Sequence, residues 1–311
     1  MKKRILVVSS ANMDFVMKVG RIPDAGQTVI ESRSYDYIPG GKGANSALAL
    51  ARLGADSIFC TRLGNDNHAQ RLKALYAENG IDTRFIVNDK AAPTGLAAIL
   101  VEESGENRII VYPGANNRLS ASDVEDAMTC LPDAVFLHFE IPTDAVIAAV
   151  DFANKKKIPV FVDTGAAKPG YPLEKLGALE VISPNETETL ALTGIVPNDV
   201  NNCLRAANEL MKKVATKYVV IKLGGRGAYI HDGKYSQLVT TYEGPVVDTT
   251  AAGDAFSAAM TLEYMRSRDI VRAVKYANAV GTLVVGKEGA STSLPTAAQV
   301  DEFILNNGIV L

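Results

Sequence analysis

Nine residues near the C-terminal end of the chain have the types and spacing for acid–base and phosphate chemistry. They read Asp-Thr-Thr-Ala-Ala-Gly-Asp-Ala-Phe from Asp248 to Phe256, and the glycine leads into a pattern that suits an amphipathic helix. A helix start exposes free N–H groups and carries about half a positive charge, so it binds phosphate or a developing oxyanion. Asp254 would repel such an anion unless it accepted a proton. The pattern therefore indicates a general base beside an anion site, although an Asp here also fits a helix cap.

A second pattern places adjacent glycines between an expected strand and an expected helix. It reads Gly-Gly-Lys-Gly-Ala-Asn from Gly40 to Asn45. Adjacent glycines suit a hinge or a close approach of the backbone to a ligand, because they have no side chain to obstruct it. A flexible turn between strand and helix is the alternative at this position.

The composition excludes several classes of protein. The chain has 311 residues, with 32 Lys and Arg against 35 Asp and Glu, a net charge of -3 and no dense basic tract, so we expect no nucleic-acid binding. No apolar stretch approaches the roughly 20 residues that cross a membrane. The cysteines are scattered and unpaired in spacing, which favours a reducing cytoplasm over disulfides: Cys60, Cys130 and Cys203. The histidines are far apart and are expected to be ordinary: His68, His138 and His231.

Strand and helix patterns alternate from Ala134 onward, which predicts an α/β fold with a parallel sheet and helices on both faces. In such sheets, ligands bind beyond the C-terminal ends of the strands. Strand-like stretches at 28–38, 94–101 and 108–112 interrupt this alternation, and they predict a small β lid. The predicted division is a main domain of residues 1–11, 39–93 and 114–311, and a lid of residues 12–38 and 94–113.

The two patterns, in this order, resemble the signatures of the ribokinase-like (PfkB) carbohydrate kinases, and the resemblance covers essentially the whole chain. It implies a three-layer α/β/α domain with a mainly parallel sheet and a small β-sheet lid. Asp254 would deprotonate the acceptor hydroxyl, and an anion hole would be formed by the N–H groups of Ala251, Ala252 and Gly253. The family often has glycine where this chain has Ala251, a change that keeps the N–H group.

The same resemblance assigns sugar ligands. Asn12 and Asp14 follow the first predicted strand and supply the donors and acceptors that vicinal hydroxyls need. Further contacts would come from the glycine-rich turn, through Gly40, Gly41, Lys42 and Asn45. Glu140 would be another sugar ligand, although by itself it also fits a solvated loop charge.

Nucleotide contacts are implied at three places. Asn185 and Glu188 would organise Mg²⁺, its waters and the phosphates of ATP, although their spacing also fits a helix capping box. A glycine-rich loop would bind ATP, with its three glycines permitting close approach to the ribose and base, or be a plain hairpin turn: Lys222, Gly224, Gly225 and Gly227. Asn278 matches a position beside adenine.

The resemblance also implies a monovalent cation, K⁺, that activates without touching the substrate. Its ligands would be the side chains of Asp248 and Ser293 and the carbonyl groups of four further residues: Thr250, Val284, Lys287 and Gly289. Hard cations prefer such oxygen ligands, and one carboxylate among neutral oxygens suits a monovalent ion. The alternative is that Asp248 caps a turn and Gly289 supplies a bend.

The expected activity is ATP-dependent phosphorylation of D-ribose at O5. The alternatives are a related kinase for another sugar, deoxyribose, a nucleoside or a sugar phosphate, and a sugar or nucleotide sensor without catalysis. The lid edges are expected to pair in a homodimer. Six apolar side chains could supply the contacts: Ile30, Tyr35, Tyr37, Ile99, Val101 and Ile109.

Overall fold

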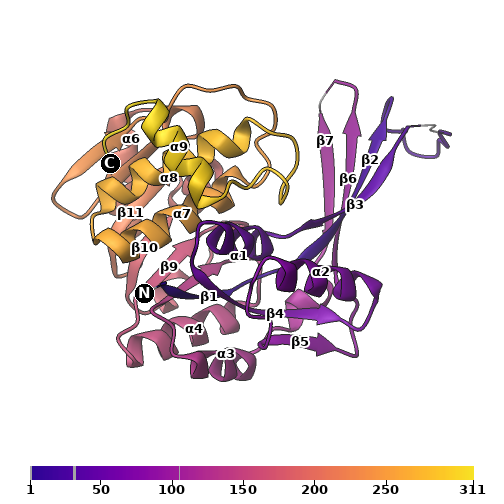
Figure 1. Ribbon diagram of the computed structural model, residues 1–311, viewed down its shortest axis with the longest axis horizontal. Helices are drawn as coiled ribbons and strands as arrows, with labels where there is room; N and C mark the ends of the chain where they lie inside the picture. Colours follow the sequence, from indigo (N-terminus) through magenta and orange to yellow (C-terminus); the bar gives the residue numbers. More distant parts are fainter. Residues whose placement is uncertain (1, 31–32, 105) are drawn as a thin grey trace.

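A sheet of nine strands forms the centre of the protein in this computed structural model, which describes residues 2–30, 33–104 and 106–311 (Figure 1). Its strands are β1 (Arg4–Val8), β4 (Asp56–Gly64), β5 (Ile86–Asp89), β8 (Ala134–His138), β9 (Val160–Asp163), β10 (Leu179–Ser183), β11 (Thr216–Lys222), β12 (Ala228–His231) and β13 (Ser236–Val239). They lie in the order β13-β12-β11-β10-β9-β8-β1-β4-β5. The pairs from β5 to β11 are parallel, whereas β12 and β13 are added antiparallel.

Helices cover both faces of this sheet, because its strands are apolar on both sides. In β1, Ile5 and Val7 face one apolar core, whereas Leu6 and Val8 face the other. The first core lies under α1 (Lys42–Arg52), α2 (Asn67–Glu78), α7 (Ala252–Ser267), α8 (Ile270–Val285) and α9 (Ala297–Asn306). The second lies under α3 (Ala121–Ala127), α4 (Thr143–Lys155), α5 (Glu186–Thr193) and α6 (Val200–Lys213). The predicted three-layer fold with a mainly parallel sheet is confirmed.

A second sheet projects from the main body beside α1 and α2 (Figure 1). It contains β2 (Asn12–Val19), β3 (Tyr35–Gly40), β6 (Gly95–Glu102) and β7 (Asn107–Tyr112), in the order β3-β2-β6-β7. The predicted small sheet is therefore present, and we call it the lid sheet. The boundaries given above for the two parts of the chain stay a prediction.

The predicted strand at 28–38 is wrong over its first part. Thr28 to Ile30 have no strand structure, positions 31 and 32 lie outside the described residues, and β3 runs from Tyr35 to Gly40. The register of β2 and β3 stops at Met17 and Tyr35, and beyond it the Lys18 N–H group donates one further hydrogen bond of 3.0 Å to Ser34 O. Thr28 to Ile30 lie beyond the end of this register.

The C-terminal ends of the parallel strands meet at one edge of the central sheet. His138, Asp163 and Ser183 are register partners at the ends of β8, β9 and β10. Side chains from distant parts of the sequence therefore converge at this edge, where ligands bind in such folds. Within the described ranges, no helix combines the length and apolar character needed to span a membrane.

Candidate active site

Asp254 lies in the first turn of α7 and is buried, with 7% of its surface exposed. Asn45 Nδ2, from α1, donates a hydrogen bond of 2.8 Å to Asp254 Oδ2. The helix begins after Ala251, whose φ of 62° is left-handed and costs an L-residue about 1–2 kcal/mol. Glycine avoids this cost, which explains its suitability at this position in the family. The structure thus places a carboxylate beside a helix start, as the sequence predicts.

Burial raises the pKa of Asp254 to about 6, and the nearby carboxylates Asp163 and Glu140 add to the increase, whereas Lys42 and Asn45 oppose it. Burial likewise raises the pKa of Asp14 to about 7, with repulsion from Glu140 and Asp254. A carboxylate with a pKa near 6 accepts a proton far more readily near neutral pH than an ordinary aspartate does. This is the property that a general base needs.

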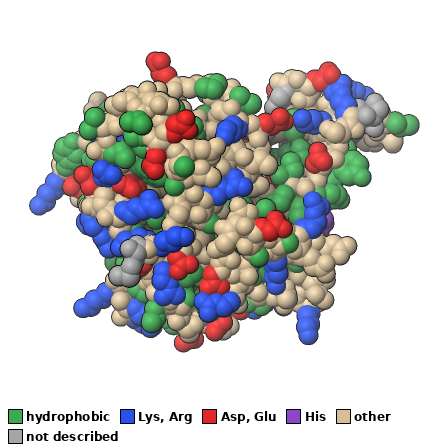
Figure 2. Space-filling model, viewed as in Figure 1, with side chains coloured by type: hydrophobic (Ala, Val, Ile, Leu, Met, Phe, Trp, Pro, Cys, Tyr) green, Lys and Arg blue, Asp and Glu red, His purple; other side chains and the backbone are tan. Residues whose placement is uncertain are grey.

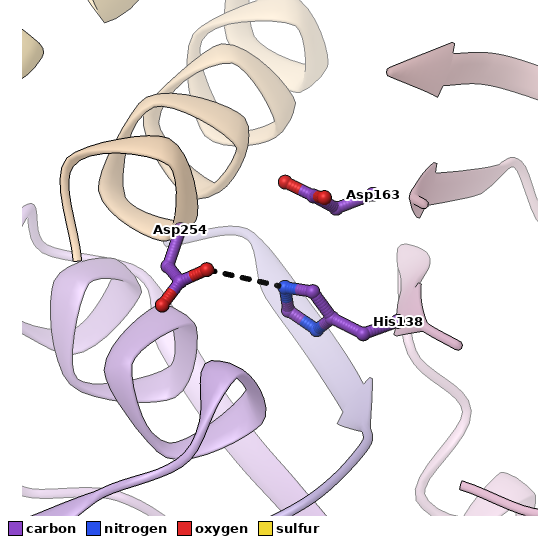
Figure 3. Close-up of side chains that lie close together, drawn as sticks. All are labelled: His138, Asp163 and Asp254. Carbon is purple, nitrogen blue, oxygen red and sulfur yellow. Dashed lines mark ion pairs between the residues drawn. The ribbon is translucent and has the colours of Figure 1, made fainter. Parts of the chain in front are cut away.

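Three buried side chains meet behind the start of α7 (Figure 3). His138 Nε2 lies 3.9 Å from Asp254 Oδ1, and the His138 ring also contacts Ser9 Oγ at 3.0 Å. Burial lowers the pKa of His138 to about 3, so the ring is neutral. His138, Asp163 and Asp254 lie close enough to hold a metal ion. However, both carboxylates already accept hydrogen bonds from protein groups, Asp254 from Asn45 and Asp163 from Lys222.

The residues predicted to bind sugar gather between the lid sheet and α1, and we call them the polar cluster: Asn12, Asp14, Gly40, Gly41, Asn45 and Glu140. Asn12 Oδ1 accepts a hydrogen bond of 2.8 Å from Asn116. A Cβ on Gly40 would lie 2.0 Å from Asp14 Oδ2, so the glycine is required where β3 passes this carboxylate. Glu140 accepts a hydrogen bond of 2.7 Å from Ser10. The structure therefore brings all of the predicted sugar ligands to one region.

Lys42 is the cation of this region. Attraction from Asp254 is the largest influence on it and raises the pKa of Lys42 despite burial, and Glu140 adds to the effect. The ammonium group therefore stays charged. Lys42 also lines a large cavity on the other side of Asp254, so these two residues join the polar cluster to the cavity.

The large cavity has a volume of 960 Å³, which is typical of sites for cofactors and other small molecules. It is lined by the whole predicted anion hole, Ala251 to Gly253, and by Asp254. It is also lined by each residue predicted to contact ATP: Asn185, Glu188, Lys222, Gly224, Gly225, Gly227 and Asn278. One of the predicted anion-hole donors already has a partner within the protein, because the Ala252 N–H group donates a 3.3 Å hydrogen bond to Thr249 O.

Several of the residues that line the cavity also make hydrogen bonds that hold the local structure. Asn185 and Glu188 form a capping box at the start of α5, and Glu188 Oε2 also accepts a 2.9 Å hydrogen bond from Thr164. The loop after Lys222 is a hairpin turn between β11 and β12 that borders the cavity. Asn278 Nδ2 donates to the carbonyl groups at the end of β13. The capping box and the hairpin turn, which were the structural alternatives, are therefore both present, and the same residues also line the cavity.

The predicted cation ligands come from two loops that contact each other. Asp248 Oδ2 accepts a 2.9 Å hydrogen bond from the Gly289 N–H group, and Asp248 Oδ1 accepts one from Thr250. Gly289 has a φ of 95°, which suits glycine. Ser293 is fully buried in the same loop, and the Lys287 N–H group donates a hydrogen bond to the carbonyl group of Val284, near the end of α8. One carboxylate with hydroxyl and carbonyl oxygens suits a monovalent cation, but both Asp248 oxygens already accept hydrogen bonds, so the alternative that Asp248 caps a turn is also present.

Sequence reasoning missed Asp163, His138 and Asn116. Asp163 and His138 each end a buried parallel strand, and that position was the available signal. Asn116 lies in a short turn after the lid sheet, and no sequence pattern there indicated a functional role. Its side chain accepts from the Ala11 N–H group at 2.9 Å and donates to Asn12, so it holds a predicted sugar ligand in place.

The α/β/α fold, the large cavity and the buried carboxylate at its edge fit an enzyme that binds small molecules and accepts a proton from one of them. A family model described as pfkB family carbohydrate kinase matches residues 2–297. The chain therefore belongs to the pfkB family of carbohydrate kinases.

Individual relatives match over their full length. The ribokinase of Staphylococcus aureus is 33% identical, and the alignment covers 97% of this chain and 100% of that protein. The structure of Arabidopsis thaliana ribokinase complexed with ribose and ATP has a TM-score of 0.88 and 30% identity, covering 98% of this chain and 99% of that one. The deoxyribokinase of Salmonella typhi is 28% identical, with 97% of this chain and 99% of that protein covered.

Proposed function

We propose that the protein transfers the γ-phosphoryl group of ATP to the 5-hydroxyl of D-ribose. The observation that carries this proposal is the position of Asp254, a buried carboxylate with a raised pKa between the large cavity and the polar cluster. The ribokinase names of the relatives, and ribose and ATP in the Arabidopsis thaliana complex, support the choice of substrates. An intact, ionisable Asp254 argues against a sensor without catalysis, because a sensor needs no general base.

In this reaction the protein positions two substrates and accepts one proton from the acceptor hydroxyl. ATP occupies the large cavity, and the sugar occupies the polar cluster. Asn45 Oδ1 is buried and has no hydrogen-bond partner among the described residues, so it can receive a sugar hydroxyl. Asp254 accepts the proton of the attacking hydroxyl. The N–H groups of Ala251, Ala252 and Gly253 stabilise the transferring group, and most of the catalysis comes from positioning and electrostatics.

Asn185 and Glu188 fit an indirectly held Mg²⁺. Both line the cavity, and the Glu188 oxygens already accept hydrogen bonds from Asn185 and Thr164, so contact through water suits them. When bound, the ion neutralises charge on the phosphate oxygens. The two residues would orient its water ligands.

The acceptor is tested by measuring ADP release with pentoses, 2-deoxyribose, hexoses, nucleosides and sugar phosphates. We expect D-ribose to give the highest kcat/KM. The 2-hydroxyl is the decisive group, since deoxyribose lacks it and one relative is a deoxyribokinase. A higher kcat/KM for another acceptor would replace ribose in the proposal but leave the kinase assignment in place. No ADP release with any acceptor would refute the kinase itself.

We expect the enzyme to be activated by K⁺ held between the loops that carry Asp248 and Ser293. Asp248 and Thr250 immediately precede the anion-hole turn, so an ion there would order that turn. Replacing K⁺ by tetramethylammonium at equal ionic strength should lower kcat. Asp248→Ala should remove the difference between the two salts.

The control for this prediction is Asp232→Ala. Asp232 also accepts N–H groups of a tight turn, from Lys234 and Tyr235, but it lies in the hairpin between β12 and β13. Loss of turn capping alone would not change the response to K⁺. Equal rates of the unmodified enzyme in the two salts would rule out the cation site.

We also propose a homodimer that forms through the lid sheet. Both edges of this sheet lack a further strand in the described residues, and apolar side chains gather on it (Figure 2). Of the predicted contact residues, Ile99 and Val101 are half-buried, and the others are exposed: Ile30, Tyr35, Tyr37 and Ile109. Edge strand β7 adds exposed Ile110, Val111 and Tyr112. Such an edge favours pairing with a second copy.

Light scattering should therefore give a mass twice that of the 33.1 kDa chain. Ile110→Lys should shift the mass to that of a monomer, because it places a charge in the apolar contact. Leu131→Lys is the matched control, since Leu131 is also exposed but lies outside the lid sheet. A monomer at micromolar concentration with full activity would contradict the dimer.

We place the protein in the cytoplasm, as expected from the sequence. Cys60, Cys130 and Cys203 are buried and free, which is typical of a reducing compartment. Detection of a tagged protein by cell fractionation would test this assignment.

A further inference from the structure

A buried ion pair lies beside the start of α7. Lys222, the last residue of β11, donates a hydrogen bond to the carboxylate of Asp163, the last residue of β9. Ser257, on α7, donates to the same carboxylate oxygen at 2.6 Å. The side chains of Lys222 and Asp163 are only 11% and 2% exposed. Burial pushes the pKa of Asp163 up, but the charge and hydrogen bond of Lys222, with the hydrogen bond from Ser257, outweigh it and hold the pKa below its usual range. Asp163 is therefore ionised.

Stability alone does not explain this pair. A buried ion pair is often no more stabilising than an apolar pair of the same volume, because both charges lose their hydration. The two residues also belong to the lining of the large cavity. A Cβ built on Gly253 would lie 3.7 Å from Lys222 Nζ, so the ammonium group lies against the turn of the predicted anion hole.

The charges around the large cavity point to the same residue. The lining contains five carboxylates, from Asp163, Glu186, Glu188, Glu243 and Asp254. Its cations, in the described part of the chain, are Lys42 and Lys222. Of the two, Lys222 is the one with an atom within 4 Å of a Cβ built on Gly253, at the turn of the predicted anion hole. Lys222 is therefore the cation available to the terminal phosphate of a nucleotide.

We propose that Lys222 is a catalytic residue whose ammonium group contacts the transferring γ-phosphoryl group, and that Asp163 and Ser257 are its positioning residues. This role rests on the proposed kinase function. In the step, the bond between the sugar O5 and the γ-phosphorus forms while the bond from that phosphorus to the leaving oxygen of ADP breaks. The hydroxyl proton passes to Asp254. Lys222 keeps its protons and offsets negative charge on the oxygens of the transferring group.

The test compares two double variants. Lys222→Met alone would leave the Asp163 carboxylate buried and unpaired, which can unfold the protein. Lys222→Met combined with Asp163→Asn removes both charges and nearly preserves their volumes. We expect this double variant to keep its circular dichroism spectrum and to lose about 10²-fold in kcat, the effect of losing one oxyanion donor.

The matched control is Lys217→Met combined with Glu180→Gln. Lys217 also lies on β11, pairs with Glu180 of β10 at 2.9 Å and contacts a hydroxyl of α7, that of Tyr264. This triad joins two strands of the sheet to α7, as the first one does, but its residues do not line the large cavity. The control should keep kcat within about threefold of the unmodified enzyme.

A binding measurement separates the role of Lys222 from general nucleotide binding. Calorimetry measures nucleotide binding without an acceptor sugar. The two nucleotides are ADP and an analogue of ATP that has an imido bridge between its β- and γ-phosphorus atoms. The Lys222→Met/Asp163→Asn variant should bind ADP as the unmodified protein does and the ATP analogue about tenfold more weakly. Equal losses for both nucleotides, or an unchanged kcat in a folded double variant, would refute the proposal.

Failure of the proposed function would give a different result. If the unmodified protein phosphorylated another sugar better than ribose, the kinetic comparison would be made with that sugar. If it phosphorylated none, the proposed function would fall, while the difference between ADP and the ATP analogue would still report whether Lys222 contacts the γ-phosphate.

Discussion

Asp254→Asn is expected to lower kcat with D-ribose by about 10²- to 10⁴-fold, the range supplied by a positioned general base. The amide has nearly the same shape as the carboxylate but accepts no proton at neutral pH. Its oxygen can still accept the hydrogen bond from Asn45, so the start of α7 should be unchanged. The ADP-coupled assay gives kcat, and calorimetry should give unchanged binding of ADP.

The same substitution is expected to preserve or increase stability. The folded protein raises the pKa of Asp254 from 3.8 to about 6, so its ionised form opposes folding. The folded state therefore loses stability as the pH rises from about 4 to 6, and the loss is complete above 6. At neutral pH it amounts to about 3 kcal/mol, at 1.36 kcal/mol per pKa unit, which the neutral amide avoids. A higher Tm than that of the unmodified enzyme at pH 7 would show this effect.

The pH dependence of catalysis gives an independent readout. A base must be ionised to act, so kcat/KM should fall as the pH is lowered through about 6. Asp151→Asn, an exposed position on α4, is the control and should leave the profile unchanged. Retention of most of the kcat by Asp254→Asn would show that another group accepts the proton.

Asp14→Ala is expected to lower kcat/KM for D-ribose by about 10²-fold or more. Above its pKa of about 7, for example at pH 8, the Asp14 carboxylate is charged and can accept hydrogen bonds from two sugar hydroxyls, each of which contributes about 1.5–3 kcal/mol. Since 1.4 kcal/mol is a factor of ten, two such bonds give at least this loss. Steady-state kinetics with ribose measures it, and affinity for ADP should not change because Asp14 lies outside the lining of the large cavity.

Gly40→Ala provides a second way to test the same contact. Its Cβ would lie 2.0 Å from Asp14 Oδ2 and would displace the carboxylate without removing it. Asp36→Ala is the control, because Asp36 is an exposed residue of β3 in the same sheet. Normal ribose kinetics in Asp14→Ala would exclude Asp14 as a sugar ligand.

Much of the fold was predictable because its signals are local. The alternation of strands and helices after Ala134, and the glycine-rich turn before α1, depend on residues close together in the sequence. The capping box of Asn185 and Glu188 is equally local. The first part of the stretch at 28–38 was wrong because pairing with a neighbouring strand decides whether such a segment becomes a strand.

For the candidate site, the sequence by itself determined which residue types stand at the start of α7 and at the ends of the strands. Only the tertiary structure decided which of them meet. Asn45 reaches Asp254 because α1 packs on α7, and Lys222 reaches Asp163 because their strands end at one edge of the sheet. The raised pKa of Asp254 also required the fold, since burial and neighbouring charges produce it and neither is set by local spacing.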